Sequence, residues 1–124
     1  MKTAVNDICG FLKQEVDVPV FDYTLPDGFS SACIVVSETT FDEEREEGTY
    51  HVNLYAPDKT RTQDGITDNA YPDMETLTEV ANQVLPLLCD IRTDEFNGWV
   101  TKRNLLKEGN NMHYINICLT IQFN

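Results

Sequence analysis

Apolar residues recur at helical spacing near the start of the chain. Over residues 4–15 they lie three or four positions apart and make one stripe, which predicts an amphipathic helix. Thr3 or Asn6 is placed to cap this helix, and Pro19 ends it. The stripe consists of Val5, Ile8, Cys9, Leu12 and Val16.

A second helical stripe follows Pro72, with Asp73 as the expected N-cap. Pro86 lies within it, so this helix is expected to kink or to shorten there, because proline lacks the N–H of an interior hydrogen bond. The stripe consists of Leu77, Val80, Ala81, Val84, Leu85 and Leu88.

Strand patterns occupy most of the remaining chain. Residues 20–25 form a short extended segment before a Pro26-Asp27-Gly28 turn. Residues 32–37 are apolar on both faces, which is typical of a strand inside a sheet. Residues 49–56 alternate, with Tyr50, Val52 and Leu54 on one face.

The last two strands are predicted at residues 99–107 and 113–123, with a turn at residues 108–111. In the final strand His113, Ile115, Ile117, Leu119, Ile121 and Phe123 share the face expected to enter the core. The order is therefore helix, short strand, two strands, helix, two strands. It predicts a single α+β domain over residues 1–124, mainly an antiparallel β-sheet packed by the N-terminal helix and the central helix.

Two polar stretches separate these elements. Residues 38–48 are expected to form an acidic loop that joins two strands of a hairpin. Residues 57–71 carry almost nothing that could pack, so they are expected to be a long loop, and loops of that length are usually functional or disordered.

Composition and charge exclude several classes of protein. The 124 residues carry a formal net charge of -12, and the nine basic residues are scattered along the chain. Specific nucleic-acid binding is not expected, since phosphate contacts require clustered Lys and Arg. The sequence has no apolar run long enough for a membrane span and no leader pattern, so the protein is expected to remain in the cytoplasm where it is made.

The four cysteines are far apart and each lies in an apolar pattern. Cys9, Cys33, Cys89 and Cys118 have no Cys-x-x-Cys or Cys/His spacing, so buried reduced thiols are expected rather than a metal site or a disulfide.

The segment FDEEREEGTYHVNLY raises the question of acid–base chemistry, because five carboxylates surround one arginine just before His51. Consecutive charges must mostly face water, which favours a solvated turn. His51 and His113 are too few for a His-rich metal site, and Ser30-Ser31 lacks a nucleophile elbow. Asp64-Gly65 lacks the regular ligands of a calcium loop, and no phosphate-binding glycine motif occurs. Neither an enzyme nor a cofactor is expected.

The chain resembles the small tail-terminator and tail-completion (head–tail joining) proteins of long-tailed bacteriophages and prophages. The resemblance rests on the N-terminal helix, VPVFDYTLPDG, the hairpin ACIVVSETTFDEEREEGTYHVNLYAPD, the helix from DMETLTEVANQVLPLL and the closing strands. Members have an antiparallel sheet flanked by helices, assemble as rings that cap or join the tail tube, and are not enzymes.

The resemblance implies a non-enzymatic structural protein that associates with itself in a ring, with a hexamer as one stoichiometry, and meets tail-tube or connector proteins. Its place would be the host cytoplasm during assembly and then the virion tail or neck. The candidate interface residues are Glu43, Glu44, Arg45 and Glu46 in the acidic loop and Arg61, Gln63 and Asp64 in the long loop.

Two other classes remain open. An acidic binding protein, a DNA mimic or inhibitor, would use its carboxylates to occupy a basic partner. A small hydrolase would need a pocket with converging polar groups and a shifted pKa. Self-assembly distinguishes the ring protein from both.

Overall fold

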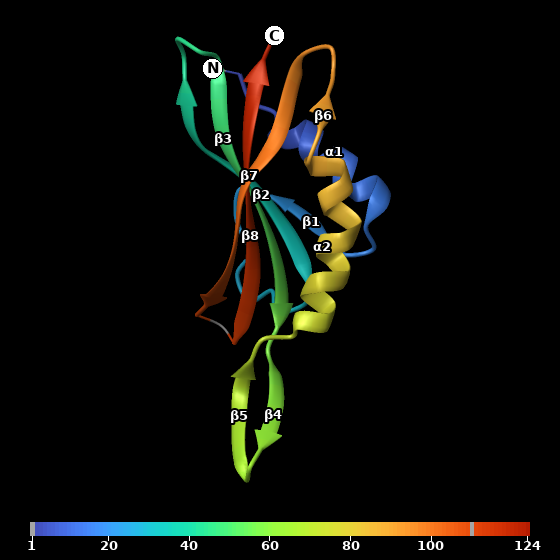
Figure 1. The fold of residues 1–124 in the computed structure, drawn as a ribbon, viewed down its shortest axis with the longest axis vertical. Helices are drawn as coiled ribbons and strands as arrows, with labels where there is room; N and C mark the ends of the chain where they lie inside the picture. Colours follow the sequence, from blue (N-terminus) through green and yellow to red (C-terminus); the bar gives the residue numbers. More distant parts are fainter. Residues whose placement is uncertain (1, 110) are drawn as a thin grey trace.

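The computed structural model describes residues 2–109 and 111–124. Within them the chain forms two helices, a twisted six-stranded sheet and a separate two-stranded hairpin that extends from one end (Figure 1). The helices are α1 (Val5–Glu15) and α2 (Met74–Leu88). The strands are β1 (Val20–Asp22), β2 (Cys33–Asp42), β3 (Glu47–Pro57), β4 (Lys59–Gln63), β5 (Ile66–Tyr71), β6 (Ile91–Arg92), β7 (Phe96–Glu108) and β8 (Met112–Phe123).

The large sheet has the strand order β1-β2-β3-β8-β7-β6. Its strands pair antiparallel, except that β1 runs parallel to β2. The predicted α+β fold with a mainly antiparallel sheet is confirmed. The two-residue strand β6 was not predicted, because two residues are too few to show a period.

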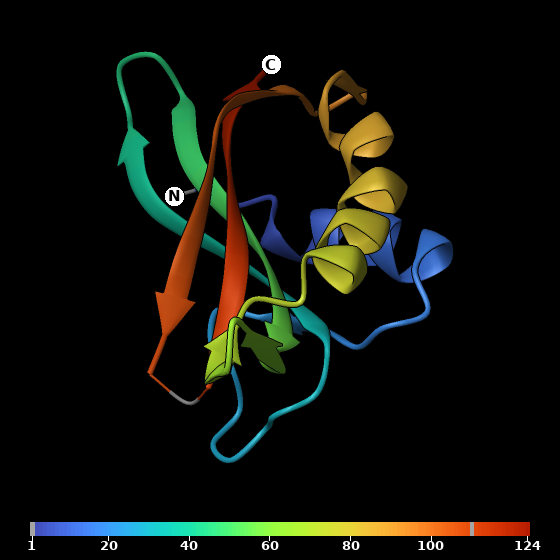
Figure 2. The ribbon, with the colours of Figure 1, turned by 60° about the horizontal axis from the view of Figure 1, so that its bottom comes forward.

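Both helices cover the same face of the sheet (Figure 2). Their predicted stripes are buried there, apart from Leu85, which is half-buried. The predicted strand faces are confirmed as well, since Tyr50, Val52 and Leu54 of β3 lie in the same core as Ile117, Leu119 and Ile121 of β8.

The opposite face of the sheet carries a smaller apolar cluster. Its buried members are Cys33, Val35, Tyr55 and Met112, and Phe21, Leu25, Phe29 and Tyr114 pack against them. The connection between β1 and β2 supplies Leu25 and Phe29, which explains why β2 is apolar on both faces. Gly28 has a φ of 73°, and the Phe29 N–H donates to the Pro26 carbonyl, as the turn prediction requires.

The two helix starts differ. Asp73 caps α2 as predicted, and its side chain accepts a hydrogen bond from the Thr76 N–H. The N-cap of α1 is Ala4, whose methyl side chain cannot accept a hydrogen bond. The prediction of Thr3 or Asn6 as N-cap is therefore wrong. The Thr3 hydroxyl oxygen only accepts the Val5 N–H, at 3.4 Å.

Pro86 does not shorten α2, which continues to Leu88. The proline lies in the last turn, where few further hydrogen bonds depend on it. No helix in the described part of the chain has both the length and the apolarity to cross a membrane.

Two loop predictions need correction. The acidic stretch is mostly strand, because β2 extends to Asp42 and β3 begins at Glu47, which leaves only residues 43–46 as the turn. The predicted long loop at residues 57–71 is the hairpin of β4 and β5. Most of its side chains are polar, and its strands pair with each other and not with the large sheet.

Candidate assembly surfaces

The hairpin of β4 and β5, here called the arm, projects along the long axis of the molecule (Figure 1). Every residue from Lys59 to Asn69 is exposed. Asp64 and Gly65 form its tip with φ values of 53° and 77°. Asp-Gly is a favoured pair for a tight hairpin turn with two positive φ angles, so the sequence did contain the signal for this hairpin. The side chain beside the tip, Ile66, is 72% exposed.

The arm has two different faces. Cross-strand pairing places Arg61 opposite Asp68 and Gln63 opposite Ile66, and these four residues surround a hollow of about 410 Å³ with Asp64 and Tyr71. The Arg61 guanidinium lies 4.6 Å from the centre of the Tyr71 ring and donates a hydrogen bond to Gln63. On the other face the side chains of Thr60 and Asn69, and those of Thr62 and Thr67, form hydrogen-bonded pairs.

The structure thus brings together three of the predicted interface residues, Arg61, Gln63 and Asp64. It adds Ile66, Asp68 and Tyr71, which the sequence pattern did not indicate because the segment has no apolar period.

Contacts with the body of the protein hold the root of the arm. The side chain of Asp58 is buried, its Oδ1 lies 2.6 Å from His113 Nδ1, and the Asp58 N–H donates to the Asn111 carbonyl. The Lys59 ammonium lies 3.1 Å from Asp73 Oδ1 at the start of α2. Partial burial raises the pKa of Asp73, but the hydrogen bonds from Thr76 and Lys59 outweigh that effect and leave the pKa below its ordinary value. These contacts orient the arm at its base only.

A second surface lies between α2 and β7. It is a groove of about 330 Å³ lined by Met74, Ala81, Leu85, Arg103, Asn104, Leu105 and Ile115. Met74 is 40% exposed and Leu105 is 47% exposed, so apolar side chains stand open to solvent there.

The groove adjoins an open edge of the sheet. On its outer side β7 pairs with β6 through Asn97 and Gly98, and among the described residues no other strand lies along the rest of this edge. This part of β7 carries three of the nine basic residues of the chain, Lys102, Arg103 and Lys107. These three basic residues lie on one strand, next to the groove.

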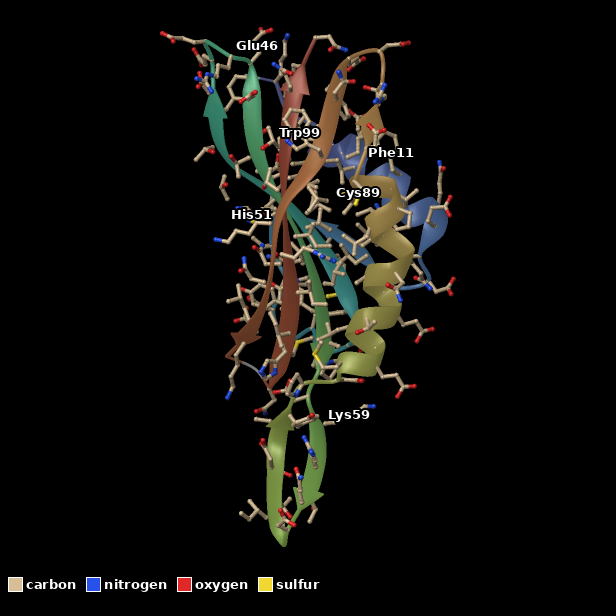
Figure 3. All side chains as sticks on the ribbon, in the orientation of Figure 1. Phe11, Glu46, His51, Lys59, Cys89 and Trp99 are labelled. Atoms are coloured by element: carbon tan, nitrogen blue, oxygen red, sulfur yellow. The ribbon has the colours of Figure 1, made fainter. Side chains whose placement is uncertain are left out.

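The other four predicted interface residues, Glu43, Glu44, Arg45 and Glu46, form the turn between β2 and β3. This turn lies at the opposite end of the molecule from the arm, as the labels of Glu46 and Lys59 show (Figure 3). Asp42 Oδ1 accepts the N–H groups of Glu44 and Arg45, and Glu46 pairs with Lys2 at 3.3 Å. All these side chains reach solvent, as a solvated turn requires. The predicted interface therefore consists of two separate surfaces.

The two histidines belong to different networks. His51 lies in a row of polar side chains across β3 and β8, where its Nδ1 is 3.0 Å from Asn116 Nδ2 and 3.5 Å from Cys118 Sγ. The buried Asn116 also donates to Asn53 Oδ1 at 2.7 Å. Buried amides need such partners, so this row is explained by satisfied hydrogen bonding alone. Within the described residues, no three His, Cys, Asp or Glu side chains are arranged to hold a metal ion.

The cysteines do not all share the predicted burial. Cys9 and Cys33 are buried, and burial raises the pKa of both thiols, that of Cys33 to about 11. Cys118 is half-buried. Cys89 is exposed, so the prediction is wrong at this position. It directly follows Leu88, the last residue of α2.

Comparison with known proteins bears on the fold. No family model matches the chain, and no curated protein matches it in sequence. Eighteen chains of solved structures are similar to it in three dimensions. One of them, whose name describes no activity, aligns with a TM-score of 0.51 and 14% identity over 94% of this chain and 86% of its own. At that identity the likeness shows the fold alone, an α+β domain.

Proposed function

We propose that this protein is a non-enzymatic structural component of a phage or prophage tail, which terminates or joins the tail tube as a homo-oligomeric ring. Its neighbours would be further copies of itself and tail-tube or connector proteins. It would be made in the host cytoplasm and end in the virion tail or neck.

The observation that carries the proposal is the arm, which is oriented at its root and exposed at every residue from Lys59 to Asn69. An isolated two-stranded hairpin is marginal in water, because its few hydrogen bonds scarcely offset the lost chain entropy. A partner that covers the arm supplies the missing stabilisation. A hairpin held out from a folded body is well suited to reach a neighbouring subunit.

The shape of the molecule favours a closed assembly. If a surface other than the arm receives the arm of a second copy, the contact is head-to-tail. Such head-to-tail contacts produce a ring when the rotation between neighbours closes. A net charge of -12 per copy also suits a channel that lets DNA pass without holding it.

Light scattering and negative-stain microscopy over a series of salt and protein concentrations test the proposal. Salt matters because it screens the repulsion between acidic subunits, with a Debye length of about 10 Å at 0.1 M. We expect closed rings at high salt, at high concentration or on purified tail tubes.

A shortened arm serves as the matched variant. Replacing Thr60–Asp68 with Asn-Gly keeps the root contacts of Asp58 and Lys59 and closes the chain with a tight turn. This variant is expected to lose assembly and to keep the melting transition of the intact monomer. A protein that stays monomeric throughout, even with tail tubes, would rule out the ring.

The acidic turn supports the alternative function. Glu43 and Glu44 are exposed in the turn that also contains Glu46, at the far end of the molecule from the arm (Figure 3), where they could meet a basic surface. If no ring forms, an acidic binding protein that occupies a basic partner becomes the first candidate, and co-purification with a basic nuclease or regulator is its test.

A further inference from the structure

The groove between α2 and β7 is open to solvent and mostly apolar, and Arg103 is its charged residue. The tip of the arm carries an exposed apolar side chain, Ile66, and a carboxylate, Asp64. We propose that the arm of one copy docks along the β7 edge of the next, with Ile66 seated in that groove. This inference rests on the proposed function, because it names the surfaces through which the ring would close.

Apolar fit is the first argument. Ile66 is the most exposed large apolar side chain in the described part of the chain, at 72%, and it sits beside the tip of a projecting hairpin. The groove exposes Met74 and Leu105 with Leu85 and Ile115 beneath. Exposed apolar side chains gathered in one place on a small protein usually mark an interaction site. One branched aliphatic side chain is the kind of group that such a groove accommodates.

Charge is the second argument. Arg103 is the charged residue among those that line the groove. Asp64 lies two residues before Ile66, at the tip of the arm, and its side chain has no ion-pair partner among the salt bridges of the described residues. Seating Ile66 beside Leu105 brings Asp64 near Arg103, two positions away on β7. In a chain this acidic, a cationic groove selects for an anionic partner.

The open backbone of β7 is the third argument. From Trp99 onward the outer N–H and C=O groups of this strand meet no other strand within residues 2–109 and 111–124. Such an edge readily accepts an added strand, and the arm presents two strands with open outer edges of their own. Lys102 and Lys107 hinder indiscriminate pairing, since charged side chains on an edge disfavour non-specific partners.

The arm does not reach the groove of its own chain. It points away from the body beyond the start of α2 (Figure 1). The groove is lined by Met74, Ala81 and Leu85 along α2 and therefore lies on the body. A donor surface and an acceptor surface at different places on one molecule make the contact head-to-tail. The geometry thus supplies a contact of the type that rings need.

Thiol cross-linking between two variants that carry a cysteine at different positions tests the docking. One copy carries Ile66→Cys and the other carries Leu105→Cys, both in a Cys89→Ser background, because Cys89 is exposed. A short bismaleimide is added under conditions in which rings form. We expect the pair to cross-link, and the control Thr67→Cys, on the other face of the arm, to link to position 105 at least about tenfold less.

A second acceptor control is Thr40→Cys, which is exposed on β2 near the opposite edge of the sheet. Rings that link position 66 to position 40, or that link 66 and 67 equally to 105, overturn the docking and leave the proposed function standing. A protein that forms no oligomer under any condition overturns both.

A double-mutant cycle tests the charged contact. Asp64→Asn removes the charge and tolerates the positive φ of the tip, and Arg103→Gln removes its partner. We expect each single variant to weaken assembly about three- to tenfold and the double variant to add little further loss, because coupled partners are not additive. If the loss of assembly in the double variant equals the product of the losses in the two single variants, the pairing of Asp64 with Arg103 is overturned.

Discussion

The backbone N–H of Ala4 donates a hydrogen bond to the hydroxyl oxygen of Tyr50 at 3.0 Å. Tyr50 is fully buried on β3, one of the two middle strands of the sheet, and Ala4 immediately precedes α1. The contact takes the place of a side-chain cap and fastens the N-terminal helix to the middle of the sheet.

Tyr50→Phe should therefore destabilise the domain. The variant keeps the ring but leaves the buried Ala4 N–H without an acceptor, which costs roughly 1–3 kcal/mol in the free energy of unfolding. Urea denaturation measures the loss. Tyr23→Phe is the control, because Tyr23 is 53% exposed and its substitution should change stability by less than about 0.5 kcal/mol. Equal effects at the two positions would contradict the role of the contact.

The same tyrosine predicts a loss of stability at alkaline pH. Burial, together with the neighbouring Glu38 carboxyl, raises the pKa of Tyr50 from 10 to about 12. The unfolded chain releases this proton first, so the contribution is complete below pH 10 and declines as the pH rises toward 12. The advantage of the wild type over Tyr50→Phe should shrink across that window in urea titrations. A constant difference would show that Tyr50 titrates alike in both states.

The acidic turn should contribute little to folding. Replacing Glu43, Glu44 and Glu46 by glutamine removes charges that face water, and each change should shift the unfolding free energy by about 0.5 kcal/mol or less. The Lys2–Glu46 pair does not alter this expectation, since exposed ion pairs contribute little. Thermal melting of the triple variant is the measurement. A large drop in melting temperature would reveal a network that the exposed side chains do not suggest.

The thiols should react in a fixed order. Cys89 is exposed and is expected to react with a maleimide in the native protein, whereas Cys9 and Cys33 should require denaturant, because they are buried and burial raises their pKa. Mass spectrometry of the labelled peptides gives the order. Labelling of Cys33 as fast as Cys89 would contradict the cluster on the second face of the sheet.

The two faces of β8 should differ sharply in their tolerance of charge. Ile117 is fully buried between the sheet and the helices, so Ile117→Asp should prevent folding, because an unpaired carboxylate is not solvated there. Gln122 is exposed, and Gln122→Asp should leave the melting transition nearly unchanged. Circular dichroism melts distinguish them. Similar behaviour of the two variants would refute the assignment of faces.

Local patterns determined most of the fold. The stripes from Val5 to Leu12 and from Leu77 to Leu88 predicted both helices, and the alternation from His113 to Phe123 predicted the longest confirmed face of the sheet. These predictions succeed because burial against one core imposes a period of 3.6 or 2 on the residues themselves. Asp73 likewise predicted the start of α2, because an N-cap hydrogen bond joins residues that are close together in the chain.

Only the tertiary structure decided how the surfaces are arranged. The arm was mistaken for a loop because its polar strands bury nothing and therefore carry no apolar period, although Asp64-Gly65 marked its turn. The groove beside Leu105 depends on how far α2 extends across the sheet, and the Ala4–Tyr50 bond joins residues 46 positions apart. Contacts between distant residues leave no period in the sequence, because they arise only when separate elements pack together.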